Sequence, residues 1–168
     1  ARAVSLAIVH MNLGMNNREL VYNERFNPEI PIPLGAQKIH GISDADVEDC
    51  PTFIQMLPAI MTLLKGRMLA AYNLPYDWGI LDSEMHRTVG LRYPWYGICG
   101  KVVAMKVDEK QQGKGFHRLC NVAKRRGLTY EEHDAAADAL TAAEILDIML
   151  PELSKSLSVK FNSFREYW

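Results

Sequence analysis

The sequence predicts a single α/β domain with a mixed β-sheet, on three observations. The first is an N-terminal part, 3–26, in which two segments rich in β-forming residues flank a group of turn residues. The second is a short apolar segment at 68–72, which suits a buried strand. The third is a series of helical segments before and after that strand. Strands followed by alternating helices and strands are typical of the α/β class.

The N-terminal part predicts a β-hairpin and a loop. We expect strands at 3–9 and 19–26, because both segments are rich in β-forming side chains. The Asn and Gly residues of 12–17 favour a turn between them. Three prolines stiffen 27–34, which therefore predicts an extended loop rather than a helix.

The remainder predicts mainly helices, which are expected at 44–49, 53–64, 76–89, 116–126 and 135–149. The second of these begins with a capping-box pattern, Thr52 followed by Gln55. The last is rich in alanine and is expected to end before Pro151. The segment 102–105 fits either a helix or a strand, and 157–168 has no clear period.

The composition is that of a globular chain. Its 168 residues are 48% hydrophobic and 23% charged, enough for one domain with its own core. Cys50, Cys99 and Cys120 form no CxxC pair, which indicates reduced thiols and disfavours a zinc site. No apolar run reaches the length of a membrane span and no signal peptide opens the chain, so we expect a cytoplasmic protein.

Charge is unevenly distributed along the chain. The formal net charge of -1 excludes a polycation, so nucleic-acid contact would come from a local basic patch or from metal ions. Residues 101–126 carry an excess of Lys and Arg, whereas 131–147 hold only acidic charges. A basic stretch beside an acidic cluster suits a metal site next to a polyanion. The alternative is two solvated faces.

Asp77 is the first candidate site residue, at the end of the segment Asn73–Asp77. It follows the expected strand at 68–72 and stands near the start of a helix. A carboxylate there lies on rigid backbone at the mouth of an α/β sheet, where ligands usually bind. The alternative is that Asp77 only caps the helix.

His133 and Asp138 form the second candidate group. Their spacing of five places them about 140° apart on a continuous helix, so they converge only if His133 stands at or before the first turn. A histidine near a metal-binding carboxylate can act as a general base with a pKa of about 7. The alternative is a surface histidine followed by an exposed aspartate.

The segment His40–Gly41–Ile42 is the third candidate. Gly41 allows a backbone turn that would present His40 and Ile42 to a ligand. The alternative is a plain loop before a helix.

Taken together, these segments resemble the DnaQ-like (DEDDh) 3′–5′ exonucleases, most of all the bacterial proofreading branch of the DNA polymerase III epsilon type. Asn73 to Asp77 resembles the second motif of that family, and His133 with Asp138 resembles the third. The order of 31–33, 40–42 and 51–53 also matches the proofreading branch. Tyr72 departs from the pattern, because this branch often has His there.

The resemblance covers about residues 2–150 and implies a ribonuclease H-like fold, a mixed five-stranded sheet flanked by helices. It implies one exonuclease domain over 1–168, with 151–168 as a C-terminal extension. The Asp-x-Glu of the family's first, central strand is absent. Because residues 2–9 resemble the second strand, we expect that motif upstream of Ala1, and without it the metal site lacks two carboxylates.

The resemblance also implies a mechanism. Two divalent ions, Mg²⁺ or Mn²⁺, would be bound by carboxylates that include Asp77 and Asp138, and His133 would be the general base. Residues expected to contact the terminal nucleotides are His40, Gly41, Ile42, Asn73 and Tyr76.

The expected substrate is a single-stranded or frayed 3′ end of DNA, in proofreading or repair, with a DNA polymerase subunit as a possible partner. One alternative is an RNA-trimming exonuclease of the same fold. Another is a non-catalytic nucleic-acid-binding or polymerase-partner module that lacks the first motif. An Asp-x-Glu encoded upstream of Ala1 would favour the enzyme.

Overall fold

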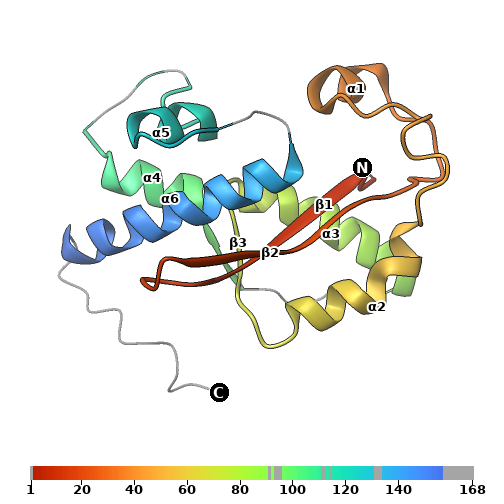
Figure 1. Cartoon of the computed structure of the whole chain (residues 1–168), viewed down its shortest axis with the longest axis horizontal. Helices are drawn as coiled ribbons and strands as arrows, with labels where there is room; N and C mark the ends of the chain where they lie inside the picture. Colours follow the sequence, from red (N-terminus) through yellow and green to blue (C-terminus); the bar gives the residue numbers. More distant parts are fainter. Residues whose placement is uncertain are drawn as a thin grey trace.

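The computed structural model describes residues 2–90, 92, 96–110, 113, 115–130 and 134–156. Four strands and six helices follow one another in these ranges. Figure 1 shows how the labelled elements are arranged. In chain order they are β1 (Ser5–Asn12), β2 (Asn17–Arg25), α1 (Leu34–His40), α2 (Phe53–Leu64), β3 (Leu69–Ala71), α3 (Leu74–Val89), β4 (Gly97–Cys99), α4 (Gly100–Val107), α5 (Leu119–Arg125) and α6 (Ala135–Ser156).

β1 and β2 form the expected antiparallel hairpin. Ser5 lies opposite Arg25 and Asn12 opposite Asn17, with a shift in register between Ile8 and Val9. Both strands reach further toward the turn than predicted, because pairing across the hairpin extends the ladder into residues with weak strand propensity.

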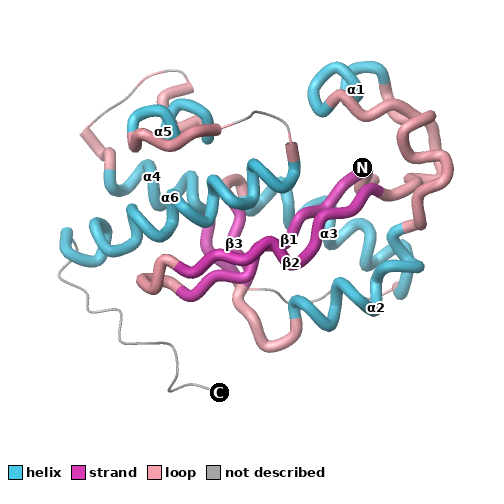
Figure 2. The backbone as a smooth tube through the Cα atoms, viewed as in Figure 1, coloured by secondary structure: helices cyan, strands magenta, loops and turns pink. Residues whose placement is uncertain are grey.

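The four strands lie in two separate sheets, β1–β2 and the parallel pair β3–β4. The predicted α/β class is confirmed, but the described residues do not form one continuous mixed sheet. α6 contacts β1, β2 and β3, and so it links the two sheets (Figures 1 and 2). β4 was not predicted, because three residues that include a glycine carry no recognisable strand pattern.

α2, α3 and α6 confirm the predicted helices, although α3 begins at Leu74 rather than at 76 and α6 ends later than predicted. α2 spans the predicted residues, and the Thr52 N–H donates to Gln55 Oε1 at 2.8 Å, as the capping-box pattern indicates. α6 continues through Pro151 to Ser156, beyond its predicted end. Burial of Met149 and Leu150 in the core outweighs the backbone hydrogen bond that Pro151 cannot make.

Other local predictions were wrong. The expected helix at 44–49 is a series of turns, whereas an unpredicted helix, α1, follows the proline-rich loop. The ambiguous segment 102–105 lies in α4, and α5 is shorter than the predicted helix at 116–126. The predicted absence of a period in 157–168 falls outside the described residues.

The core consists of two large clusters. One lies between α4, α5 and α6, and the α6 side chains that it buries are at most 8% exposed: Ala142, Ile145, Leu146, Met149 and Leu150. The other joins the hairpin to α2 and α3, with Phe26 against Phe53 at its centre. Both helices that carry the candidate aspartates are therefore fixed by packing.

No helix in the described part of the chain combines the length and apolarity needed to cross a bilayer. Cys50, Cys99 and Cys120 form no disulfide bond in the described part of the chain, as predicted. Each is half-buried, in a different part of the fold.

Candidate functional site

Asp77 lies in the first turn of α3, directly beyond β3. The helix begins at Leu74 with Asn73 as its N-cap residue, and the Asn73 carbonyl accepts the Tyr76 N–H at 2.8 Å. Asp77 is therefore not the cap residue, and the capping alternative is excluded. Its carboxylate stands near a helix N-terminus, where negative charge is favoured.

Asp138 holds a similar place in α6. That helix begins at Ala135, and Asp134 Oδ1 accepts the Ala137 N–H at 2.8 Å, which satisfies one of the free donors at the helix start. Asp138 lies in the first turn, and its Oδ1 accepts a hydrogen bond from Tyr130 Oη at 2.5 Å. His133 lies outside the described residues.

The two aspartates influence one another electrostatically. The pKa of Asp77 is raised, mainly because neighbouring atoms remove water from its carboxyl group, and further because of the negative charge of Asp138. A hydrogen bond from its own backbone N–H opposes this effect. Asp77 is nevertheless an exposed residue, so a ligand from solution can reach it. Two helix starts far apart in sequence thus lie near enough for the charge of Asp138 to act on Asp77.

The donor chemistry of this pair fits a hard divalent cation. Carboxylate oxygens are the ligands that Mg²⁺ prefers, and Mg²⁺ commonly takes one or two carboxylates and completes its shell with water and phosphate oxygens. Among the described residues, no three His, Cys, Asp or Glu side chains gather into a fuller ligand set. The pair alone therefore suits one ion, and a second would need further ligands.

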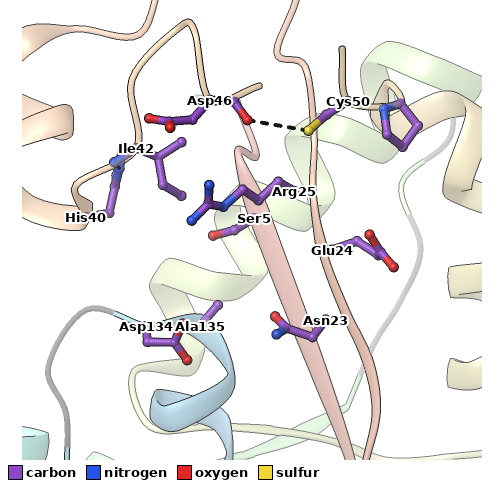
Figure 3. Close-up of a pocket in the computed structure, with 11 residues that line it drawn as sticks. Ser5, Asn23, Glu24, Arg25, His40, Ile42, Asp46, Cys50, Asp134 and Ala135 are labelled. Atoms are coloured by element: carbon purple, nitrogen blue, oxygen red, sulfur yellow. Dashed lines mark hydrogen bonds between the residues drawn. The ribbon is translucent and has the colours of Figure 1, made fainter. Parts of the chain in front are cut away.

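A recess of about 460 Å³ lies beside the start of α6. Figure 3 shows residues from three parts of the chain around it, with the Arg25 side chain between Ile42 and Ser5. The residues that line it are Ser5, Asn23, Glu24, Arg25, His40, Ile42, Asp46, Cys50, Pro51, Asp134 and Ala135. The structure therefore brings the His40–Ile42 segment to the start of the helix that carries Asp138.

The backbone turn expected at Gly41 is present, with φ at +71° at the end of α1. His40 is half-buried, and its Nδ1 accepts the Ile42 N–H at 3.1 Å. Ile42 is only 6% exposed and packs with Ile32 and Val47. Its main contribution is thus to the core, and only its remaining surface faces the recess.

Asn73 and Tyr76 accompany Asp77 at the start of α3. Both are exposed, and the Tyr76 residue is 64% accessible. Neither lines the recess beside α6. The predicted nucleotide contacts therefore fall into two groups, one near Asp77 and one near the start of α6.

The basic stretch 101–126 is partly used for structure. Arg125 and Arg126 each contact Asp108 at 3.2 Å, and Arg126 also contacts Glu152 at 3.0 Å. Arg125 further lies over the Phe116 ring, 3.6 Å from its centroid. The described cations of this stretch that form no ion pair within 4.0 Å with the described residues are Lys101, Lys110, Arg118 and Lys124. Among the described cations of this stretch, these four remain for a polyanion.

Part of the acidic stretch 131–147 also has a structural role. Glu144 and Asp147 pair with Arg18 of the hairpin at 3.5 and 2.6 Å, which fastens β2 to α6. Sequence reasoning missed this partner because Arg18 lies far away in the chain. It also missed Tyr130, whose bond to Asp138 has no periodic or motif signal.

Known proteins resemble this chain in sequence and in fold. The sequence model of the family described as "Exonuclease" matches residues 1–146. DNA polymerase III subunit epsilon of Pasteurella multocida is 32% identical over 137 residues, which are 78% of this chain and 54% of that protein. The chain spans still smaller shares, 21% and 10%, of two other curated relatives.

Two solved structures are similar in fold. Exonuclease X in complex with 5′ overhanging duplex DNA aligns with a TM-score of 0.62 at 21% identity, covering 94% of this chain and 85% of that one. The nuclease domain of 3′hExo, a DEDDh family member, bound to rAMP, also has a TM-score of 0.62, at 15% identity, covering 96% and 97%. The expected ribonuclease H-like fold is thereby confirmed.

Proposed function

Because this chain belongs to the exonuclease family, we propose that it is a metal-dependent 3′–5′ exonuclease that removes nucleotides from DNA 3′ ends. The observation that carries the proposal is the pairing of Asp77 with Asp138 at two helix starts. When two carboxylates lie near one another, the negative charge of each makes it less favourable for the other to ionise, and a cation between them would relieve this repulsion. Such an arrangement is characteristic of sites built to bind a metal.

Asp77 and Asp138 would hold Mg²⁺ or Mn²⁺, with two ions when further carboxylates complete the site. When bound, the metal supplies charge neutralisation at the scissile phosphate and a water of lowered pKa. His133 would take the proton from the attacking water, and its position five residues before Asp138 supports that role.

The remaining predicted residues would hold the 3′ end. The exposed Tyr76 ring beside Asp77 offers a stacking surface that accepts any base. Asn73 and Tyr76 would contact the terminal nucleotide, while His40, Gly41 and Ile42 would contact the strand where it passes the recess. The unpaired Lys and Arg side chains of 101–126 would meet backbone phosphates, so binding should weaken with salt.

The biological setting is proposed from the relatives. The similarity to DNA polymerase III subunit epsilon favours a single-stranded or frayed DNA 3′ end, in proofreading or repair, and a polymerase subunit as partner. The free thiols of Cys50, Cys99 and Cys120 suit the cytoplasm. We also propose that 1–168 form one exonuclease domain, with 151–168 as its extension.

The test is Mg²⁺-dependent digestion of 3′-labelled single strands, with matched DNA and RNA oligonucleotides. We expect shortening from the 3′ end that EDTA stops, faster on DNA, and near-complete loss in Asp77→Ala and Asp138→Ala. Faster digestion of RNA would identify an RNA-trimming enzyme instead. Digestion by either variant at the wild-type rate would refute the assigned site.

One observation favours a second candidate, a non-catalytic binding module. The described residues bring together only two candidate carboxylate ligands. A binding module would retain the labelled strand in a mobility-shift assay and leave it intact with Mg²⁺ or Mn²⁺.

A further inference from the structure

Tyr130 makes a direct contact with a candidate metal ligand. It stands between α5 and α6, and its hydroxyl donates to Asp138 Oδ1 at 2.5 Å. Its ring is half-buried and packs against the cluster that also holds Val122, Ile145 and Met149. The hydroxyl is therefore fixed by the core rather than carried on a freely moving side chain.

A hydrogen bond of this kind fixes the position of the carboxylate. At 2.5 Å, the O–H donated to Asp138 is short and charge-assisted, so it holds one carboxylate oxygen in place. It also limits rotation of the carboxyl group. A carboxylate has about four acceptor positions on its two oxygens, so one hydrogen bond from Tyr130 does not by itself block a cation.

We propose that Tyr130 is a positioning residue that orients Asp138 for a divalent cation. The inference rests on the proposed metal-dependent function. Partners that hold metal-ligating carboxylates affect affinity without touching the metal. Tyr130 would act in the same way, by presenting Asp138 in one orientation before the cation arrives.

The variant Tyr130→Phe removes the hydroxyl and keeps the ring in the core. We expect it to bind Mn²⁺ about tenfold more weakly than wild type, measured by electron paramagnetic resonance of free Mn²⁺ during titration. Its melting temperature in EDTA should stay close to that of wild type, because the ring packing is unchanged. A purely structural role would lower the melting temperature and leave the affinity unchanged.

Tyr72→Phe is the matched control. The Tyr72 hydroxyl also makes a hydrogen bond, at 2.8 Å, but to the backbone carbonyl of His117. We expect this variant to bind Mn²⁺ as wild type does. Equal loss of affinity in both variants would overturn the specific role of Tyr130.

Asp138→Asn separates this inference from the proposed function. If wild type binds Mn²⁺ and Asp138→Asn loses it, while Tyr130→Phe binds as tightly as wild type or more so, only the role of Tyr130 is overturned. If wild type binds no Mn²⁺, or Asp138→Asn binds it as wild type does, the metal site and the role of Tyr130 are both wrong.

Discussion

Asp138, in the first turn of α6, lies close enough to Asp77, in the first turn of α3, for its charge to raise the pKa of Asp77. Both carboxylates stand on helices whose other faces are fixed in the core. Neither can move away to relieve the repulsion without disturbing that packing. The pair is therefore less favourable when metal-free than when a cation lies between the two groups.

Asp77→Asn should raise the stability of the metal-free protein at neutral pH. Because the folded pKa of Asp77 lies above its ordinary value of 3.8, the native state binds more protons than the unfolded chain between the two values. Below pH 3.8 the protonated Asp77 carboxyl does not destabilise the folded state. As the pH rises through the raised pKa, the carboxyl ionises and the free energy of unfolding falls. Melting curves in EDTA should show an advantage of Asp77→Asn that grows as the pH rises from 3.8 through the raised pKa of Asp77.

Asp46 is the control, because its pKa is shifted in the opposite direction from that of Asp77. Hydrogen bonds from the Ser43 hydroxyl and backbone N–H, at 2.5 and 2.7 Å, lower the pKa of Asp46. The ionised Asp46 stabilises the folded state above the ordinary pKa, and this stability is lost as the pH falls through the lowered pKa. The variant Asp46→Asn should therefore be less stable than wild type, and the difference should be largest at neutral pH. A matching pH trend for Asp77→Asn would contradict the first prediction.

His133→Ala should slow digestion by about 10²–10⁴ and spare metal binding, as loss of a general base does. The comparison needs single-turnover rates at saturating Mg²⁺ together with Mn²⁺ affinity. His133→Gln is the companion variant, because its amide can still hold a water but cannot accept the proton. A rate equal to that of wild type in either variant would remove His133 from the mechanism.

Glu84→Ala should lower the free energy of unfolding by about 2–3 kcal/mol. Glu84 is 1% exposed, accepts the Ala3 N–H at 2.9 Å and pairs with Arg87, so its loss leaves a buried donor unsatisfied. Urea denaturation measures the change. The control is Glu109→Ala, whose side chain is 75% exposed and 3.8 Å from Lys106, with an expected change below about 0.5 kcal/mol.

Gly97→Ala should destabilise the fold by about 1–3 kcal/mol, because the new Cβ would overlap with closely packed atoms. It would lie 2.6 Å from the Leu69 carbonyl oxygen and 2.8 Å from Leu74 Cδ2, between β3 and the start of the helix that carries Asp77. Digestion rate should fall with stability. Gly79→Ala is the control, since no atom lies within 4 Å of its Cβ, and it should stabilise α3 by about 0.5–1 kcal/mol.

The elements predicted correctly are those whose signals are local. Turn residues between two β-forming segments indicated the hairpin, and the Thr52–Gln55 pattern indicated the start of α2. The elements missed depend on distant contacts. β4 exists because three residues pair with β3, and α6 continues past Pro151 because Met149 and Leu150, directly before it, are buried.

The candidate site likewise combines features that local sequence predicts with features that depend on distant contacts. The sequence by itself determined which carboxylates to suspect, since Asp77 and Asp138 stand in recognisable local patterns, and it predicted the turn at Gly41. Only the tertiary structure decided that Asp138 lies near enough to Asp77 to raise its pKa. It also decided that Arg18 forms ion pairs with Glu144 and Asp147, and that the Tyr130 hydroxyl donates to Asp138. The physical reason is that patterns of propensity and capping act over a few residues. Charge coupling and side-chain hydrogen bonds depend instead on distances that packing alone sets.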